Sequence, residues 1–370
     1  MSFIEHFKKL DWDNIKLSIY SKTARDVERA LGKNKLDLED FKALISPAAE
    51  SYIEQMAQQS YRLTRQRFGH TIGFYIPLYL SNLCANSCSY CGFSMDNRIK
   101  RKTLNLIEIS GEIRAIKAMK FDSVLLVTGE HETKVGMKYF RQTLPLIKQS
   151  FNYLAMEVQP LEQHQYAELK TLGLDAVMVY QETYHPSTYA QHHLRGNKQD
   201  FYYRLDTPDR LAKAGIDKIG IGALIGLEEW RTDCFFTATH LQYLEKQYWQ
   251  SRYSISFPRL RPCEGGVQPK SVMTDKQLVQ LICAYRLFNP QVELSLSTRE
   301  SPQFRDNVLA LGVTSISAAS KTQPGGYANA DVELEQFAIS DERSAQQVEA
   351  AVKSRGFEAV WTDWHSAYSG

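Results

Sequence analysis

Eight short runs of strand-forming residues alternate with helical stretches from residue 71 onward, and this alternation limits the fold more than any other feature. The runs are rich in Val, Ile, Leu and Tyr and are bounded by Gly, Pro, Asp or Ser, as buried strands are. They span residues 71–80, 123–128, 153–158, 175–180, 218–224, 252–257, 292–297 and 313–318. Eight β–α alternations are what a closed parallel barrel requires. The sequence therefore predicts an α/β fold, a (β/α)8 TIM-type barrel.

The segments around these runs have a helical pattern. In the first connection, apolar residues recur at three- and four-residue steps, namely Leu106, Ile109, Ile113, Ile116 and Met119. Residues 1–70 are polar and helical in pattern, with no strand signal. We therefore expect a helical N-terminal extension over 1–70 and a barrel over 71–370. Its core would cover about 71–300, and the last two strands with the C-terminal segment would cover 291–370.

Charge and composition exclude several classes of partner. The chain has 44 basic and 42 acidic residues, a net charge of +2, which argues against nucleic acid or an anionic membrane as the main partner. No run of 18 apolar residues occurs, so no membrane span is expected. The first residues, MSFIEHFKKLDWDN, lack the apolar core of a secretory signal. We expect a cytoplasmic protein.

Polar and glycine-rich segments follow most of the predicted strands. They read SNLCANSCSYCGF, GEH, QETYH, PRLRPCEGG, TRES and ASKTQPGG. Loops are often polar and rich in glycine, so each segment alone means little. Because a parallel barrel carries its active site at the carboxyl ends of its strands, the segments together predict one shared site.

Three of the six cysteines, Cys84, Cys88 and Cys91, fall within eight residues as Cx3Cx2C. Structural zinc normally takes four protein ligands, and the remaining cysteines form no second pair. A four-iron cluster held by three thiolates would leave one iron open to a small molecule. The alternative is a zinc site completed by a distant residue such as His131, in a non-catalytic scaffold.

This motif, with the aromatic Tyr90 before its last cysteine, resembles the signature of the radical SAM superfamily. The resemblance implies a [4Fe–4S] cluster on the three cysteines and S-adenosylmethionine on the open iron, cleaved to methionine and a 5′-deoxyadenosyl radical. Further residues lie in segments that resemble the family's cofactor-binding segments. These are Tyr90, Glu130, Glu182, Arg204 and Gly222. The two glutamates could instead be surface acids, and Arg204 could be a solvated helix residue.

Longer stretches resemble the tyrosine lyases of thiamin biosynthesis, the 2-iminoacetate synthases (ThiH). They include YIPLYLSNLCANSCSYCGFSMDNRIKRKTL, MEVQPL, VMVYQETYH, GIDKIGIGALIGL and ELSLSTRES. The resemblance implies cleavage of L-tyrosine at Cα–Cβ to 2-iminoacetate and 4-methylphenol. It also implies association with the thiazole synthase subunit and a low-potential electron donor such as flavodoxin. A tryptophan lyase and a hydrogenase-cofactor maturase share the fold, so a lyase or maturase for another substrate stays open.

A substrate carboxylate needs a fixed cation, preferably a planar guanidinium. Arg299 follows the seventh predicted strand. Its position resembles that of the arginine that anchors the substrate carboxylate in related lyases. Ser317 and Ser320, at the end of the eighth run, could bind the same amino-acid head. Loop packing or partner contact is an equal alternative for two other arginines, Arg259 and Arg261. The sequence names no base for the substrate amine.

We expect no catalytic role for two further cysteines. Cys263 lies near the predicted site, and Cys283 lies in the apolar stretch LVQLICAYRLF, where a small core residue is typical.

Overall fold

The computed structural model describes residues 2–329 and 335–362. Its main sheet is a closed parallel barrel in the order β1-β3-β4-β5-β7-β8-β9-β10, and β10 pairs back onto β1 with Tyr75 opposite Ser317. The barrel strands are β1 (Thr71–Ser81), β3 (Ser123–Thr128), β4 (Tyr153–Glu157), β5 (Ala176–Met178), β7 (Lys218–Gly222), β8 (Arg252–Ser256), β9 (Glu293–Leu296) and β10 (Ser315–Ser317). Each lies within or overlaps one of the eight runs identified in the sequence, so the predicted barrel is confirmed.

Three short strands lie outside this set. The strands are β2 (Ser87–Cys88), β6 (His193–Arg195) and β11 (Glu358–Val360). β2 and β6 pair antiparallel beside the barrel mouth, and β11 pairs with the start of β1 at Thr71 and Glu358. The sequence analysis did not predict β11.

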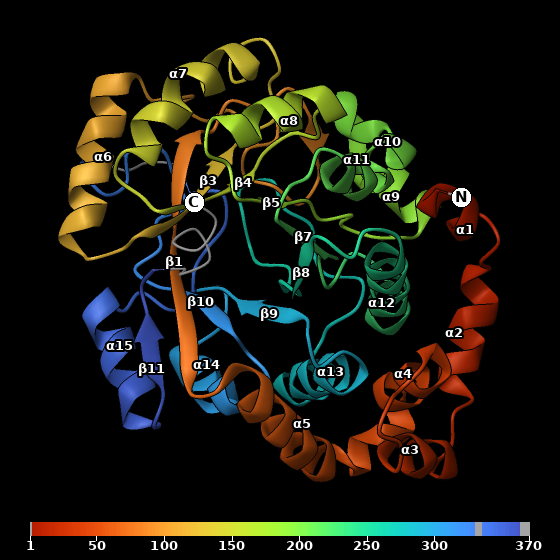
Figure 1. Cartoon of the computed structure of the whole chain (residues 1–370). Helices are drawn as coiled ribbons and strands as arrows, with labels where there is room; N and C mark the ends of the chain where they lie inside the picture. Colours follow the sequence, from red (N-terminus) through yellow and green to blue (C-terminus); the bar gives the residue numbers. More distant parts are fainter. Residues whose placement is uncertain (1, 330–334, 363–370) are drawn as a thin grey trace.

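Helices surround the barrel (Figure 1). Those that connect barrel strands or follow them are α6 (Leu106–Ala118), α7 (Met137–Lys148), α8 (Gln163–Thr171), α9 (Pro186–His192), α10 (Phe201–Leu205), α11 (Thr207–Lys213), α12 (Trp230–Gln247), α13 (Asp275–Phe288), α14 (Pro302–Val308) and α15 (Ala345–Ser354), with short 3-10 turns at Asn197–Gln199 and Leu309–Leu311. Polar caps fix where several of them begin. At α6, the Asn105 side chain accepts hydrogen bonds from the backbone of Ile107 and Glu108 at 2.9 and 3.0 Å.

Residues 2–70 contain no strand and form an outer layer of helices. The helices are α1 (Phe3–Phe7), α2 (Trp12–Tyr20), α3 (Ala24–Leu31), α4 (Leu38–Ile45) and α5 (Ile53–Phe68), with a 3-10 turn at Pro47–Ser51. Figure 1 shows them, in red and orange, wrapped around the outside of the barrel. α2 and α4 contact α12, and α4 and α5 contact α13. Their apolar side chains join the core of the barrel, so this layer shares one hydrophobic core with it.

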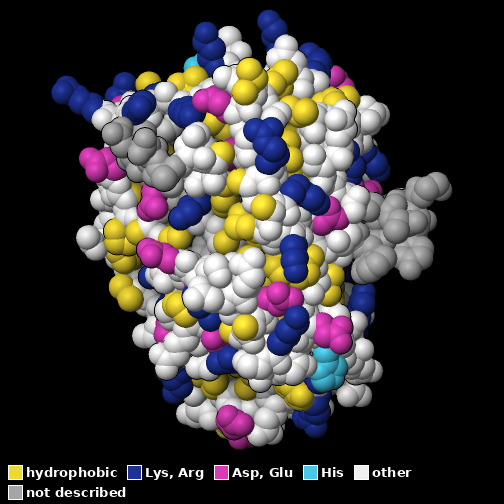
Figure 2. Space-filling model, turned by 90° about the vertical axis from the view of Figure 1, so that its left-hand side faces the viewer, with side chains coloured by type: hydrophobic (Ala, Val, Ile, Leu, Met, Phe, Trp, Pro, Cys, Tyr) yellow, Lys and Arg dark blue, Asp and Glu magenta, His cyan; other side chains and the backbone are white. Residues whose placement is uncertain are grey.

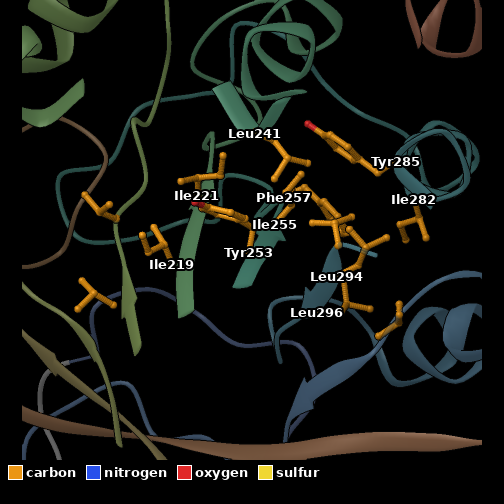
Figure 3. Packing of buried hydrophobic residues seen from close by; sticks show 14 of the residues in the cluster. Ile219, Ile221, Leu241, Tyr253, Ile255, Phe257, Ile282, Tyr285, Leu294 and Leu296 are labelled. Carbon is orange, nitrogen blue, oxygen red and sulfur yellow. The ribbon is translucent and has the colours of Figure 1, made fainter. Parts of the chain in front are cut away.

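Side-chain alternation along the strands separates the core from the barrel interior. Large apolar residues of β7, β8 and β9 point outward and meet α12 and α13 (Figure 3). The outward set in that view is Ile219, Ile221, Tyr253, Ile255, Leu294 and Leu296, all buried. The alternate positions hold small or polar residues, namely Gly220, Gly222, Ser254, Ser256, Glu293 and Ser295. Because these do not fill the interior, the barrel retains the space in which the site lies.

The surface carries both signs of charge. On the face shown in Figure 2, Lys and Arg side chains alternate with Asp and Glu, and apolar groups are scattered among them. Among the described helices, none is long and apolar enough to span a membrane.

Candidate active site

The cysteine loop leaves the carboxyl end of β1 and its fold is held by Arg101. The guanidinium donates to four carbonyls of the loop, including those of Asn82 and Phe93, both at 2.8 Å. Gly129, after β3, lies so close to the loop that a Cβ there would come within 2.4 Å of the Leu83 carbonyl oxygen. This contact places Gly129 and Glu130 directly beside Cys84.

The sulfurs of Cys84, Cys88 and Cys91 open onto one cavity at the barrel mouth, and no fourth cysteine is among its described lining residues. Burial raises the pKa of all three thiols, to about 11 for Cys84. A metal that replaces the thiol protons would relieve this cost. Three thiols that line one cavity fit a [4Fe–4S] cluster with one open iron.

A zinc site has less support. Within residues 2–329 and 335–362, no three His, Cys, Asp or Glu side chains lie close enough together to bind a single ion. His131 accepts a hydrogen bond from the Lys134 backbone through Nδ1, at 3.3 Å, and so closes a turn. A four-iron cluster is larger than one ion and spaces its ligands more widely.

Four charged groups that are largely buried form one wall of the cavity. The Arg204 guanidinium binds Glu130 at 3.0 Å and Glu182 at 3.5 Å, and the Lys198 ammonium binds Glu182 at 2.8 Å and lies 3.9 Å from Glu130. Asn86 donates a further hydrogen bond to Glu130 at 2.7 Å. We call Glu130, Glu182, Lys198 and Arg204 the charged quartet. Its two acids and two bases cancel, so the wall is buried without net charge.

The pKa shifts within the quartet follow from this pairing. Burial acts against both acid and base, but Arg204 and Lys198 hold the pKa of Glu130 below its usual value. Burial and Arg204 oppose the charge on Lys198, yet Glu182 and Glu130 outweigh them and raise its pKa. Arg204 is therefore a buried, paired cation and not a solvated helix residue, and neither glutamate is a surface acid.

Glu182 has a left-handed backbone, with φ of 68°. This conformation costs a non-glycine residue about 1–2 kcal/mol. The hydrogen bond from the Leu224 backbone to the Glu182 carbonyl, at 2.8 Å, holds it in place. Gly222 precedes Leu224 by two residues, and a Cβ on Gly222 would lie 2.2 Å from the Ser256 carbonyl oxygen. Gly222 therefore allows β7 and β8 to approach closely. It is not among the described lining residues of the cavity, whereas Leu224 is.

Tyr90 lies between the cysteines and the quartet. Its hydroxyl lies 2.8 Å from Nε2 of His193, and Nδ1 of His193 lies 2.6 Å from the Tyr189 carbonyl. Because a carbonyl only accepts, Nδ1 carries the proton and Tyr90 donates to Nε2. Burial and the Lys198 charge lower the pKa of His193 to about 2, so the pair stays neutral. The Lys198 ammonium lies 5.6 Å from the Tyr90 ring centre.

The opposite wall holds Arg299. Its guanidinium stacks on Phe337, 3.4 Å from the ring centre, and has no carboxylate partner among the described residues. Ser320 also lines the cavity, and its buried hydroxyl has no hydrogen-bond partner in the described part of the chain. Ser317 accepts a hydrogen bond from the Thr298 backbone at 3.1 Å. This wall therefore presents an unpaired cation and an unsatisfied hydroxyl to the same cavity.

Arg259 and Arg261 lie outside the set of cavity-lining residues. Both bind the buried carboxylate of Glu300, Arg259 through Nε at 3.0 Å and Arg261 through Nη2 at 3.2 Å. Both positive charges are therefore paired with Glu300 in a contact between loops. Cys263 donates to the Tyr90 carbonyl at 3.1 Å, and Cys283 is fully buried on α13.

A C-terminal segment closes the mouth beside Cys91. Gln336 donates to the Cys91 sulfur at 3.7 Å and accepts from the Tyr79 hydroxyl at 2.7 Å. Its carbonyl accepts from the Gly92 backbone at 3.1 Å, and a Cβ on Gly92 would lie 2.6 Å from that oxygen. The sequence analysis missed Gln336, as it missed Lys198 and Glu157.

Comparisons with known proteins agree with this geometry. The family model of the Radical SAM superfamily matches residues 78–233, and that of the Biotin and Thiamin Synthesis associated domain matches residues 256–358. The 2-iminoacetate synthase of Salmonella typhimurium is 62% identical over 99% of this chain and 97% of its own length. The corresponding enzyme of Escherichia coli is 61% identical over the same shares.

Solved structures show the same fold. The FeFe-hydrogenase maturase HydG from Carboxydothermus hydrogenoformans superposes with a TM-score of 0.84 at 30% identity, covering 97% of this chain and 82% of that one. Methylornithine synthase (PylB), at 19% identity and a TM-score of 0.73, covers 90% of this chain and 97% of that one and shares the fold.

A closed barrel with three cysteines after its first strand, matched by that superfamily, defines a radical SAM enzyme, which uses a [4Fe–4S] cluster and S-adenosylmethionine. Within this class, the chain belongs to the 2-iminoacetate synthase family.

Proposed function

We propose that this chain cleaves the Cα–Cβ bond of L-tyrosine to give 2-iminoacetate and 4-methylphenol, and that the cavity at the barrel mouth is the site. Its relatives at 62% and 61% identity are 2-iminoacetate synthases. The observation that carries the proposal is the pair of walls facing one cavity. The charged quartet lies beside the cysteines, and the unpaired Arg299 lies on the other side.

The quartet is suited to a zwitterion. When bound, the cluster and S-adenosylmethionine supply a one-electron cleavage that yields a hydrogen-abstracting species. The methionyl part of this cofactor carries one ammonium and one carboxylate, and the wall offers Glu130 and Glu182 to the first and Arg204 and Lys198 to the second. Since the wall is neutral overall, binding a group that is itself neutral overall adds no uncompensated charge.

Arg299 orients the tyrosine. A planar guanidinium binds a carboxylate through two parallel hydrogen bonds, which fixes distance and direction together. Stacking on Phe337 holds that plane in place before the substrate arrives. The free hydroxyl of Ser320 supplies a further hydrogen bond to the amino-acid head.

The remaining roles concern partners and location. An imine hydrolyses in water, so we expect direct transfer of the product to a thiazole synthase subunit. Reduction of the cluster calls for a low-potential donor such as flavodoxin, and the cytoplasm is the compartment we propose.

Anaerobic turnover tests the function. The reconstituted chain is given S-adenosylmethionine, dithionite and, in separate reactions, tyrosine, tryptophan or phenylalanine. We expect 5′-deoxyadenosine and 4-methylphenol in equal amounts with tyrosine alone. About four irons per chain are expected, whereas about one zinc would indicate a scaffold. Coupled cleavage of tryptophan in place of tyrosine would contradict the proposal.

A further inference from the structure

Glu157 stands apart from the other acids of the site. It ends β4, where it pairs in register with Val127 of β3, and it lines the cavity at the barrel mouth. Three carboxylates are among the described lining residues, Glu130, Glu157 and Glu182. The other two belong to the charged quartet, but no hydrogen bond or ion pair to a described residue reaches the Glu157 carboxylate. It is the acid of the cavity left free to act on a ligand.

The phenols and the amine that line the cavity cannot accept a proton near neutral pH. Burial raises the pKa of the four lining phenols, which stay protonated; they belong to Tyr75, Tyr79, Tyr90 and Tyr180. Lys198 stays cationic within the quartet. Histidine is absent from the described lining residues.

We propose that Glu157 is the catalytic base that takes a proton from the ammonium group of the bound amino acid. The inference rests on the tyrosine lyase function proposed above. Tyrosine enters as a zwitterion, and its nitrogen must lose both a proton and a hydrogen atom to reach the neutral imine. In the proposed reaction the hydrogen atom leaves the neutral amine, so the proton must leave first. One N–H bond of the ammonium breaks, its electron pair stays on nitrogen as the lone pair, and the proton forms an O–H bond on the Glu157 carboxylate. The transfer gives an amine and a carboxylic acid and needs no oxidant or reductant.

The position of the anchor supports this role. The ammonium group is attached to the carbon that bears the carboxylate, so a carboxylate held by Arg299 confines the ammonium to the same part of the cavity. Arg299 and Glu157 line that cavity from β9 and β4 and are close enough for Arg299 to act on the titration of Glu157. An unpaired cation and an unpaired anion thus match the two charged ends of one α-amino acid.

The electrostatic surroundings place the titration in a useful range. Burial, and then Glu182, raise the pKa of Glu157 to about 7, against the opposing charges of Arg299, Lys198 and Arg204. The phenols of Tyr79 and Tyr180 also face it and stay neutral. Above about pH 7 the carboxylate is ionised and can accept a proton, and below it the carboxyl is already protonated. A base with a pKa near the working pH is the most effective one.

The test compares Glu157→Gln, Glu157→Asp and wild type in the reconstituted enzyme. For Glu157→Gln we expect a full cluster and normal tyrosine-independent cleavage of S-adenosylmethionine. Its kcat/KM for tyrosine at neutral pH should fall by about a hundredfold or more. Glu157→Asp keeps a carboxylate and should recover part of the loss. Glu245→Gln is the matched control, because Glu245 is also a half-buried acid with a raised pKa but lies on α12, away from the cavity, where it accepts a hydrogen bond from Asn289.

The pH profile distinguishes a base from a structural residue. Wild type should lose kcat/KM below about pH 7 and level off above it. In Glu157→Gln the neutral amine must come from solution, so kcat/KM should rise about tenfold per pH unit through pH 7–8.5 without a plateau. A wild-type rate and profile in Glu157→Gln, or loss of the cluster in it, would overturn the inference while wild type still cleaves tyrosine. Absence of tyrosine cleavage by wild type would instead remove the proposed function, and this inference with it.

Discussion

The two walls of the cavity treat their charges in opposite ways. In the charged quartet every ionic group has a partner of opposite sign within the chain. On the other wall Arg299 and the Ser320 hydroxyl have no such partner among the described residues, and Glu157, on β4 between β3 and β5, faces them unpaired from the quartet's side. A buried charge without a partner destabilises the fold. The first wall avoids this cost before any ligand binds, and the second leaves it for the substrate to offset.

This difference supports the roles proposed for the two walls. A wall already paired keeps its shape whether or not a ligand is present, which suits a cofactor that must be held the same way in every turnover. The unpaired Arg299 and Glu157 favour a ligand that completes both pairs, and an amino-acid zwitterion does so with its two charged ends. We therefore propose that Arg299 and Glu157 select the substrate class and that the charged quartet fixes the position of the cofactor.

Loss of a cluster ligand should have the largest effect, because the proposed roles of both walls depend on the cluster and on cleavage of S-adenosylmethionine. Replacing Cys88 by Ala removes one of the three thiols, and we expect loss of the cluster and of all S-adenosylmethionine cleavage. Cys283→Ala is the control, since Cys283 is buried in the core and should affect stability alone. Iron content and 5′-deoxyadenosine formation report the two outcomes. Cleavage at a normal rate by Cys88→Ala would refute the ligand assignment.

Removal of one member of the charged quartet should weaken binding of S-adenosylmethionine. Arg204→Ala leaves Glu130 and Glu182 with Lys198 alone, so the neutral wall becomes anionic. Loss of a charge-assisted contact in a closed site costs about 2–4 kcal/mol, or roughly thirty- to a thousand-fold in affinity. We expect weak binding of S-adenosylmethionine, measured by equilibrium dialysis, with an intact cluster. Cofactor affinity equal to that of wild type would show that the quartet is only structural.

Arg299→Lys tests the unpaired wall with its charge preserved. The ammonium of lysine lacks the bidentate fork, so the carboxylate is no longer fixed in direction. A small displacement of the reacting atom can cost about a hundredfold in rate. We expect normal cofactor binding, slow tyrosine turnover and 5′-deoxyadenosine in excess of 4-methylphenol. The ratio of the two products measures this uncoupling. If Arg299→Lys and Arg299→Ala both keep the wild-type ratio and rate, the anchor lies elsewhere.

The parts that the sequence predicted are those with a local signal. The eight strands have apolar runs bounded by turn residues, and the cysteines have a fixed spacing. Glu157 had a signal that went unused: a single acid inside the strand run YLAMEV is a charge on a buried strand, and alternation with Met156 points it into the barrel. Lys198 and Gln336 gave no such signal. Their roles depend on loops that meet only after the barrel closes, across 112 residues between Asn86 and Lys198 and 245 between Cys91 and Gln336.

Replacement of Gln336 should have the smallest effect, because Gln336 belongs to neither wall and contacts only one of the three cysteines. Its amide donates to the Cys91 sulfur at 3.7 Å, and hydrogen bonds to cluster sulfurs stabilise the reduced, more negative state. If that bond is worth about 1 kcal/mol, its loss in Gln336→Leu lowers the midpoint potential by about 40 mV for a one-electron couple. Gln336→Glu is the contrasting variant: a carboxylate cannot donate and adds negative charge, so its potential should fall further. A redox titration followed by electron paramagnetic resonance measures both. Equal potentials in all three proteins would mean that Gln336 only anchors the loop through its backbone contact with Gly92, and that the potential is set within the cysteine loop itself.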